Sequence, residues 1–341
     1  MLISKLATLD RSKYGVIDSH TAGAPTRLLY RGAPKPRGSN MMQKKQNLMR
    51  EYDHVRTALM QEPRGNNGVV AIPVTPTRME ADVGLIFADY RGYVDMCIHG
   101  TIGVVTTLVE CGLTTREKIK SRTFVFDTPA GLVRTSFELR GKKKVSHVRL
   151  ANVPSFYFGD QEVVTHSFGR AEMSIAFGGN IYGYVDAARL GLKVRPESIK
   201  DLLKAGREIL AEAKELDVRH EALPNIRGVL GVSLYESLGK FKTRNIMIAA
   251  NDLFDRSPCG TGTCGRMAVE YAKGRFKIGD EFESRSVIDS VFYGRVLESR
   301  QIEGGIGEGI MPEIKGTAYV TGACDVVVSD VDPLSRGFLV N

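Results

Sequence analysis

The pattern C-x-x-G-T-x-G occurs twice in this chain, as CIHGTIG from Cys97 and as CGTGTCG from Cys259. Each copy follows a segment rich in β-forming residues and precedes an apolar stretch of helical character, which reaches Glu110 in the first copy and Glu270 in the second. Close to half of the 341 residues separate the two cysteines. Because the flanks match as well as the pattern, duplication explains the repeat better than chance. We therefore expect two similar α/β domains that face each other, each presenting its cysteine at the start of a helix.

The length of 341 residues suits two domains of roughly 150 residues each. The first domain is expected to span residues 1–148 and 318–341 and to carry Cys97, and the second to span residues 149–317 and to carry Cys259. Hydrophobic periodicity predicts strands within 15–31, 68–74, 82–88, 122–150, 227–236, 243–250 and 316–330, and helices at 41–61, 103–109, 197–216 and 262–272.

Charge and cysteine content narrow the class of protein. The formal net charge is +8, but no interleaving of basic and aromatic residues and no zinc-ligand spacing accompanies it, so we expect a solvated basic face and no nucleic-acid partner. No run of about 18 apolar residues predicts a membrane span, and the N-terminal segment lacks the apolar core of a signal peptide, so we expect a cytoplasmic protein. Five cysteines without a CxxC pair indicate free thiols.

A cysteine at the start of a helix is suited to moving a proton at a carbon atom. The helix macrodipole and the free backbone N–H groups lower the pKa of a thiol there, and the thiolate is the basic form. The same N–H groups can bind a substrate carboxylate. Two such sites facing each other place one sulfur on each face of the same Cα. The repeat therefore predicts racemisation by two bases, in which one thiolate removes the proton and the opposing thiol supplies another.

This chemistry needs neither a metal nor pyridoxal phosphate, so we expect no cofactor and no metal site. His99 lies two residues after the first cysteine and Asp255 four residues before the second, where they could hold the substrate amine and tune the thiols. The alternatives are a packing or capping histidine and a turn or N-cap aspartate before a proline. The remaining cysteines are expected to be packing residues: Cys111, Cys264 and Cys324.

These motifs resemble the proline racemase family, which also contains hydroxyproline 2-epimerases and trans-3-hydroxy-L-proline dehydratases. The resemblance runs nearly end to end and rests on IDSHTAG at 17–23, EPRG at 62–65, FGGN at 177–180 and DRSPCGTGT at 255–263, besides the first cysteine motif. It implies a diaminopimelate-epimerase-like fold of two pseudo-symmetric α/β domains, each a curved sheet or barrel around a central helix. It also implies an amino-acid substrate and a possible homodimer.

The resemblance assigns roles to individual residues. It implies that Cys97 and Cys259 are the acid–base pair of a cofactor-independent racemisation or epimerisation at Cα of proline or hydroxyproline-like amino acids. Contacts to the substrate amine are implied for His99 and Asp255. Backbone N–H groups that take the carboxylate are implied at four positions: His99, Gly100, Gly260 and Thr261.

The chain departs from the family pattern at Ala24, Asn66, Ile98 and Ala249. Ile98 replaces the usual Gly and is expected to tighten the carboxylate site, whereas Ala249 replaces a frequent Phe and is expected to enlarge the side-chain pocket. Family dehydratases usually replace one of the two cysteines, so the presence of both favours a racemase or epimerase. The alternatives are a trans-3-hydroxy-L-proline dehydratase and a divergent, non-catalytic amino-acid-binding protein.

Overall fold

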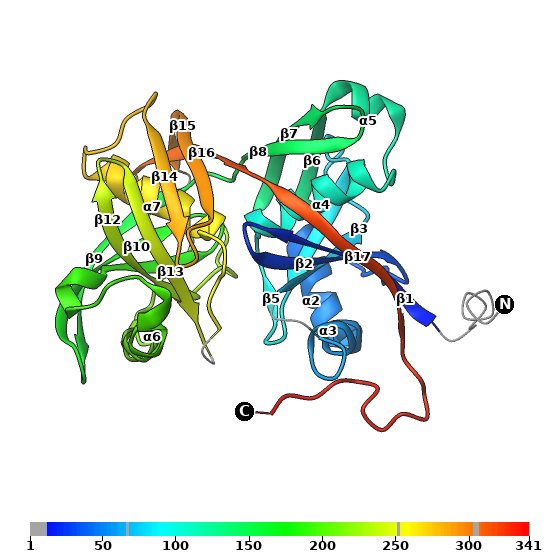
Figure 1. Ribbon diagram of the computed structural model, residues 1–341, viewed down its shortest axis with the longest axis horizontal. Helices are drawn as coiled ribbons and strands as arrows, with labels where there is room; N and C mark the ends of the chain where they lie inside the picture. The colour runs from blue at the N-terminus through cyan, green and yellow to red at the C-terminus, as the bar shows by residue number, and fades with distance from the viewer. Residues whose placement is uncertain (1–11, 66–67, 251–252, 303–306, 341) are drawn as a thin grey trace.

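The computed structural model describes residues 12–65, 68–250, 253–302 and 307–340, arranged in two halves that stand side by side (Figure 1). The first half contains β1 (Ser12–Thr21), β2 (Ala24–Arg31), α2 (Met41–Glu51), α3 (Asp53–Met60), β3 (Val69–Val74), β4 (Val83–Ala88), β5 (Tyr93–Val94), α4 (Ile98–Glu110), α5 (Arg116–Ser121), β6 (Thr123–Thr128), β7 (Gly131–Arg140), β8 (Lys144–Ala151) and β17 (Ala318–Val327).

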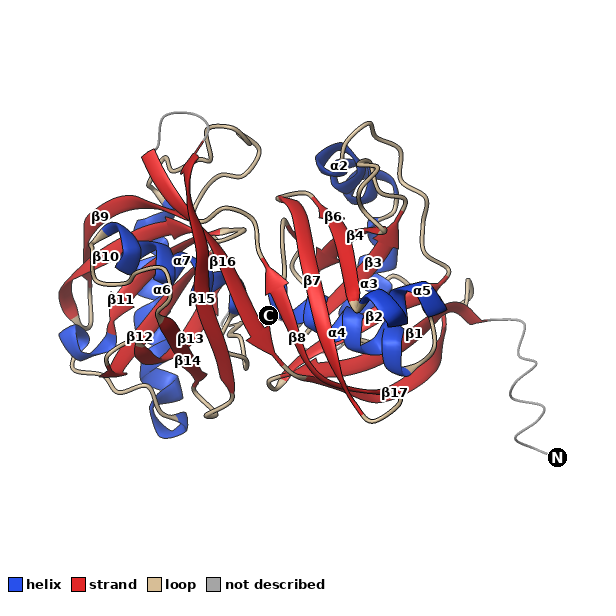
Figure 2. Cartoon of the chain, turned by 90° about the horizontal axis from the view of Figure 1, so that it is seen from above, coloured by secondary structure: helices blue, strands red, loops and turns tan. Residues whose placement is uncertain are grey.

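The second half contains β9 (Phe156–Thr165), β10 (Gly169–Phe177), β11 (Ile181–Asp186), α6 (Ile199–Lys214), β12 (Gly231–Gly239), β13 (Lys242–Ala249), α7 (Gly260–Ala272), β14 (Glu281–Ser286), β15 (Val291–Ile302) and β16 (Gly307–Gly316). Two short 3-10 helices, Ala187–Leu190 and Pro196–Ser198, precede α6. Figure 2 shows the strands of each half curving around its helix, α4 in the first half and α7 in the second.

Each half is built around one buried helix that begins at a repeat cysteine. Helix α4 packs against β1, β2, β3, β8 and β17, and α7 packs against β9, β10, β11, β15 and β16. A helix that is apolar or small on all sides is stable only when it is enclosed, and the sequence IHGTIGVVTTLVE fits this description. The mixed α/β fold with a central helix in each half is the one expected from the sequence.

The last glycine of the repeat explains how closely each helix approaches its sheet. A Cβ at Gly103 would lie 2.9 Å from the Ser19 Oγ atom of β1. A Cβ at Gly265, the same position of the second copy, would collide with the hydroxyl of Tyr184 on β11. The pattern therefore preserves glycine at this position because the helix and the sheet leave no room for a side chain.

Hydrogen-bonded strands connect the two halves. Strands β8 and β16 pair antiparallel from Val148 opposite Gly316 to Ala151 opposite Glu313. The chain then crosses back, and β17 pairs antiparallel with β1 (Figure 1). The expected boundary at residue 148 falls inside β8, and residue 317 lies between β16 and β17. The division into domains stays a prediction.

The single helix expected at 41–61 is wrong, because the chain breaks at Tyr52 into α2 and α3. Tyr52 has φ −126° and ψ 14°, outside helical values. Apolar residues of both helices pack into one buried cluster, which contains Leu48, Val55 and Leu59.

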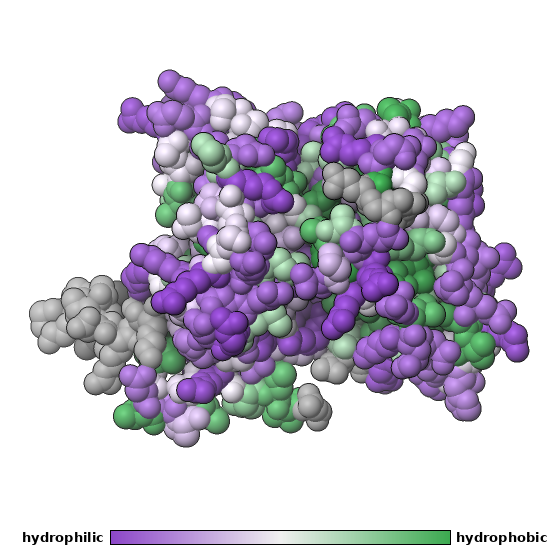
Figure 3. Space-filling view, turned by 180° about the vertical axis from the view of Figure 1, so that it is seen from behind, coloured by the Kyte–Doolittle hydropathy of each residue, from purple (hydrophilic) through white to green (hydrophobic). Residues whose placement is uncertain are grey.

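Many basic residues of the N-terminal region are paired with acidic side chains. Arg56 contacts Asp53 at 2.7 Å, and Arg78 contacts the buried carboxylate of Asp127 at 2.6 Å. Hydrophilic residues cover most of the face seen in Figure 3. Over the described ranges, no helix is long and apolar enough to cross a membrane.

Candidate active site

Cys97 and Cys259 are the N-cap residues of the two central helices, as the repeat predicts. Cys97 has an extended backbone, φ −141° and ψ 110°, and its sulfur accepts the N–H of Gly100 at 3.3 Å. Cys259 has φ 56°, in the left-handed region that residues with a side chain rarely occupy. Such strain is concentrated at functional sites, where the surrounding structure maintains it.

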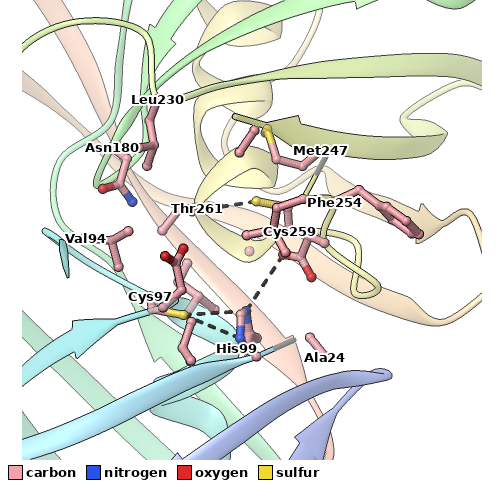
Figure 4. Close-up of a pocket in the computed structure, with 18 of the residues that line it drawn as sticks. Ala24, Val94, Cys97, His99, Asn180, Leu230, Met247, Phe254, Cys259 and Thr261 are labelled. Carbon is pink, nitrogen blue, oxygen red and sulfur yellow. Dashed lines mark hydrogen bonds and ion pairs between the residues drawn. The ribbon is translucent and has the colours of Figure 1, made fainter. Parts of the chain in front are cut away.

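Both cysteines line one cavity between the two halves, with a volume of about 100 Å³ (Figure 4). A water needs roughly 10–15 Å³ on this measure, so the cavity has room for a ligand the size of a small amino acid. Each half contributes part of the wall. The lining residues include Asp89, Arg91, Val94, Met96, Cys97, Ile98 and His99 from the first half, and Asn180, Tyr182, Leu230, Met247, Phe254, Asp255, Cys259, Gly260 and Thr261 from the second.

His99 joins the two halves of the cavity. Its Nδ1 atom lies 3.5 Å from the sulfur of Cys97 and 3.8 Å from Oδ2 of Asp255, which belongs to the second half. The other carboxylate oxygen of Asp255 accepts the backbone N–H of Ser257 at 2.8 Å. Burial lowers the pKa of His99, and the nearby Asp255 opposes this only in part. The imidazole is therefore neutral near pH 7 and retains a lone pair.

The expectation that the helix starts lower the pKa of the thiols is wrong. Burial raises the pKa of both Cys97 and Cys259 above the ordinary value. The N–H of Gly100 lowers the pKa of Cys97, but burial outweighs this contribution. The negative charge of Asp255 raises both pKa values further. Both thiols are consequently protonated near pH 7.

The expected carboxylate-binding positions are not equivalent. Gly260 and Thr261 line the cavity at the first turn of α7, where backbone N–H groups have no partner within the helix. His99 lines it at the first turn of α4. Gly100 is not among the lining residues, and its N–H is directed at the sulfur of Cys97. The Gly100 amide therefore donates its hydrogen bond to the sulfur of Cys97 and not into the cavity.

The charged and imidazole side chains that line the cavity can hold a ligand: Asp89, Arg91, His99, Asp255 and Arg256. Among the described residues, no group of three or more His, Cys, Asp or Glu side chains is arranged to hold a metal ion.

Comparison with known proteins identifies the family of this chain. The proline racemase family profile matches residues 16–339. The chain belongs to the proline racemase family. A proline racemase from Acetoanaerobium sticklandii is 39% identical over 331 residues, which cover 95% of this chain and 97% of that protein. A 4-hydroxyproline 2-epimerase from Brucella anthropi is 38% identical over 341 residues, which cover 97% of this chain and 99% of that protein.

A solved relative has the same fold. The crystal structure of a hydroxyproline epimerase from Agrobacterium vitis, with bound trans-4-hydroxy-L-proline, matches with a TM-score of 0.90 and 29% identity. The match covers 97% of this chain and 96% of that one. The predicted fold class and the prediction of an isomerase of the proline racemase family are confirmed.

Three of the four departures from the proline racemase pattern lie at the cavity: Ala24, Ile98 and Ala249. Ile98 faces the other half, since a Cβ on Gly260 would lie only 2.5 Å from its Cβ atom. The Ile98 side chain therefore fills the space between the starts of the two central helices. Asn66 lies outside the described residues.

Asn180 and Tyr182 have no role predicted from the sequence, although both lie within or beside the FGGN segment of the proline racemase resemblance. Both residues are buried and line the cavity. The segment before them is tightly enclosed, because a Cβ on Gly178 would lie 2.6 Å from the backbone N of Gly265 in α7. The two adjacent glycines were the sequence signal that this loop approaches another backbone.

Proposed function

We propose that this protein racemises or epimerises the Cα of proline or of a hydroxyproline-like amino acid, with Cys97 and Cys259 as the two proton-transferring groups. The observation that supports this most strongly is geometric. Each cysteine caps the central helix of its own half, and both line one cavity. A small amino acid in that cavity has one sulfur available to each face of its Cα.

The proposed ligand orientation follows from the charges of the wall. The first turns of α4 and α7 offer N–H groups and the positive ends of two helix dipoles, which favour a carboxylate. The amine is assigned to His99 and Asp255, since a neutral imidazole and a carboxylate both accept N–H groups. With the carboxylate and the amine fixed, Cα lies between the two sulfurs.

Substrate binding itself would help to ionise a thiol. Asp255 raises the pKa of both cysteines, and a substrate ammonium beside Asp255 would neutralise this repulsion. One cysteine loses its proton to solvent as the substrate enters and, as a thiolate, takes the Cα proton, while the other donates its proton to the opposite face. The carbanion is stabilised by the hydrogen bonds to the carboxylate in a cavity that excludes water. After one turnover the two cysteines have exchanged protonation states.

The substrate class is supported by the relatives and by the wall of the cavity. The relatives named above are a proline racemase and hydroxyproline epimerases, one of them with bound trans-4-hydroxy-L-proline. Apolar side chains that suit a pyrrolidine ring line the cavity, among them Val69, Leu230, Met247, Leu253 and Phe254. Ala249 leaves space beside that ring for a substituent.

The test is exchange of the Cα proton in deuterium oxide, followed by NMR over a panel of proline and hydroxyproline stereoisomers. We expect exchange and inversion with at least one of them, and loss of inversion in Cys97→Ser and Cys259→Ser, because a serine hydroxyl is far too weak an acid. Cys111→Ser is the matched control, since Cys111 is an exposed cysteine at the other end of α4. Absence of exchange throughout the panel would refute the proposal, and a pyrroline product would indicate dehydration instead.

A further inference from the structure

A chain of hydrogen bonds leads from the segment before Cys97 to the sulfur of Cys259. The side-chain amide of Asn180 donates to the carbonyl of Met96 at 2.8 Å and to the hydroxyl of Tyr182 at 3.3 Å. The Tyr182 hydroxyl lies 3.0 Å from Oγ1 of Thr261, which lies 3.8 Å from Sγ of Cys259. All three polar side chains are at most 6% exposed.

The direction of the protons along this chain is determined by Asn180. Its Oδ1 atom accepts the backbone N–H of Asp95 at 3.2 Å, which fixes the amide orientation and leaves both protons of Nδ2 for Met96 and Tyr182. The Tyr182 oxygen accepts one of these protons, so its own proton is free for Thr261. The Thr261 oxygen accepts in turn, which leaves its own hydroxyl proton available to the sulfur of Cys259.

We propose that Asn180 and Tyr182 are positioning residues, which hold the Thr261 hydroxyl as a hydrogen-bond donor to Cys259 and so stabilise the thiolate of this one cysteine. The inference rests on the proposed two-cysteine function. It gives the Thr261 side chain a role separate from that of its backbone N–H. Burial raises the pKa of Tyr182, so the phenol keeps the proton that the chain requires.

The chain of hydrogen bonds gives the two cysteines different hydrogen-bond donors. Cys97 receives a backbone N–H from Gly100 and has His99 beside it, whereas Cys259 has the hydroxyl of Thr261. Hydrogen bonds to charged groups are stronger than those between neutral groups, so the donor matters most once Cys259 is a thiolate. The titratable groups that interact with Cys259 are Asp255, Tyr182, Tyr184 and Cys97 from other segments and Cys264 from α7 itself.

The same chain ties Cys259 to the opposite half of the molecule. Asp95 and Met96, which hold Asn180, directly precede Cys97. A displacement of this segment therefore moves Asn180 and, through Tyr182, the donor to Cys259. Hydrogen bonds therefore link the donor to Cys259 with the segment that carries Cys97.

The experiment measures the reactivity of each cysteine separately. The full-length protein is alkylated with iodoacetamide from about pH 7 to about pH 10, and peptide mass spectrometry gives the rates at Cys259 and Cys97. In Tyr182→Phe and Thr261→Val, we expect the ratio of the Cys259 rate to the Cys97 rate to fall about tenfold. Thr261→Ser keeps a hydroxyl and should retain the ratio to within about twofold.

Tyr184→Phe is the matched control, because Tyr184 is on the same strand and donates to the Gly262 carbonyl instead of the chain. In this variant the ratio of the Cys259 rate to the Cys97 rate should stay near that of the wild-type protein. An unchanged ratio in Tyr182→Phe and Thr261→Val, or an equal fall in Thr261→Ser, would overturn the inference. The outcome is independent of turnover, so failure of the proposed function would appear in the deuterium-exchange panel and not in this ratio.

Discussion

Replacing Gly260 by Ala tests whether the two central helices must start in close contact. The added Cβ would lie 2.5 Å from the Cβ atom of Ile98. Carbon atoms prefer separations of about 3.5 Å or more, so the helix starts would have to move apart by roughly 1 Å. A displacement of 1 Å at reacting groups can cost about 100-fold in rate, and overpacking typically costs about 1–3 kcal/mol of stability.

The assay is Cα deuterium exchange together with urea denaturation of the same preparation. We expect Gly260→Ala to lose about two orders of magnitude in kcat. The double variant Ile98→Gly with Gly260→Ala removes the obstructing side chain and should recover most of that loss. Gly322→Ala is the control, because a Cβ there meets nothing within 4 Å. Full turnover in Gly260→Ala, or no recovery in the double variant, would refute the reasoning.

Three further predictions concern pH, an ion pair and a second glycine. Burial raises the pKa of Cys97 and Cys259, so kcat/KM should rise with pH and reach no plateau below about pH 9. The free energy of unfolding should fall above about pH 8.5, because the thiols ionise there in the unfolded chain but not in the folded one. Arg27→Met breaks a bidentate, largely buried pair with Asp18 and should cost about 3 kcal/mol in urea denaturation. Gly178→Ala pushes a Cβ against backbone of α7 that cannot rotate away, so it should cost about 2–3 kcal/mol by the same measurement and lower the exchange rate.

The cysteine helices were predictable because their signal is local. The motif C-x-x-G-T-x-G indicates where each helix begins, and the apolar run after it indicates that the helix is buried. The close approach of Gly103 to Ser19 is a tertiary contact. The sequence nevertheless indicates it, because both copies of the repeat have glycine at this position.

The missed features depend on contacts that no local pattern encodes. Asn180 acts on Met96 across 84 positions of sequence, and Tyr182 acts on Thr261 across 79. The direction of the thiol pKa shift was also missed, because a helix start is visible in the sequence but the extent of burial is not. Strand β15 is absent from the predicted strands, although its buried residues Phe292, Gly294 and Val296 alternate with exposed ones.

The return of β17 has a consequence for any attempt to divide this molecule. The strand that covers one edge of β1 is synthesised only after the entire second half. A fragment that ends near residue 150 would leave that edge with unpaired N–H and C=O groups, which invite association with foreign strands. Supplying the C-terminal strand as a separate peptide should cap the edge, so the first half is a natural subject for fragment complementation.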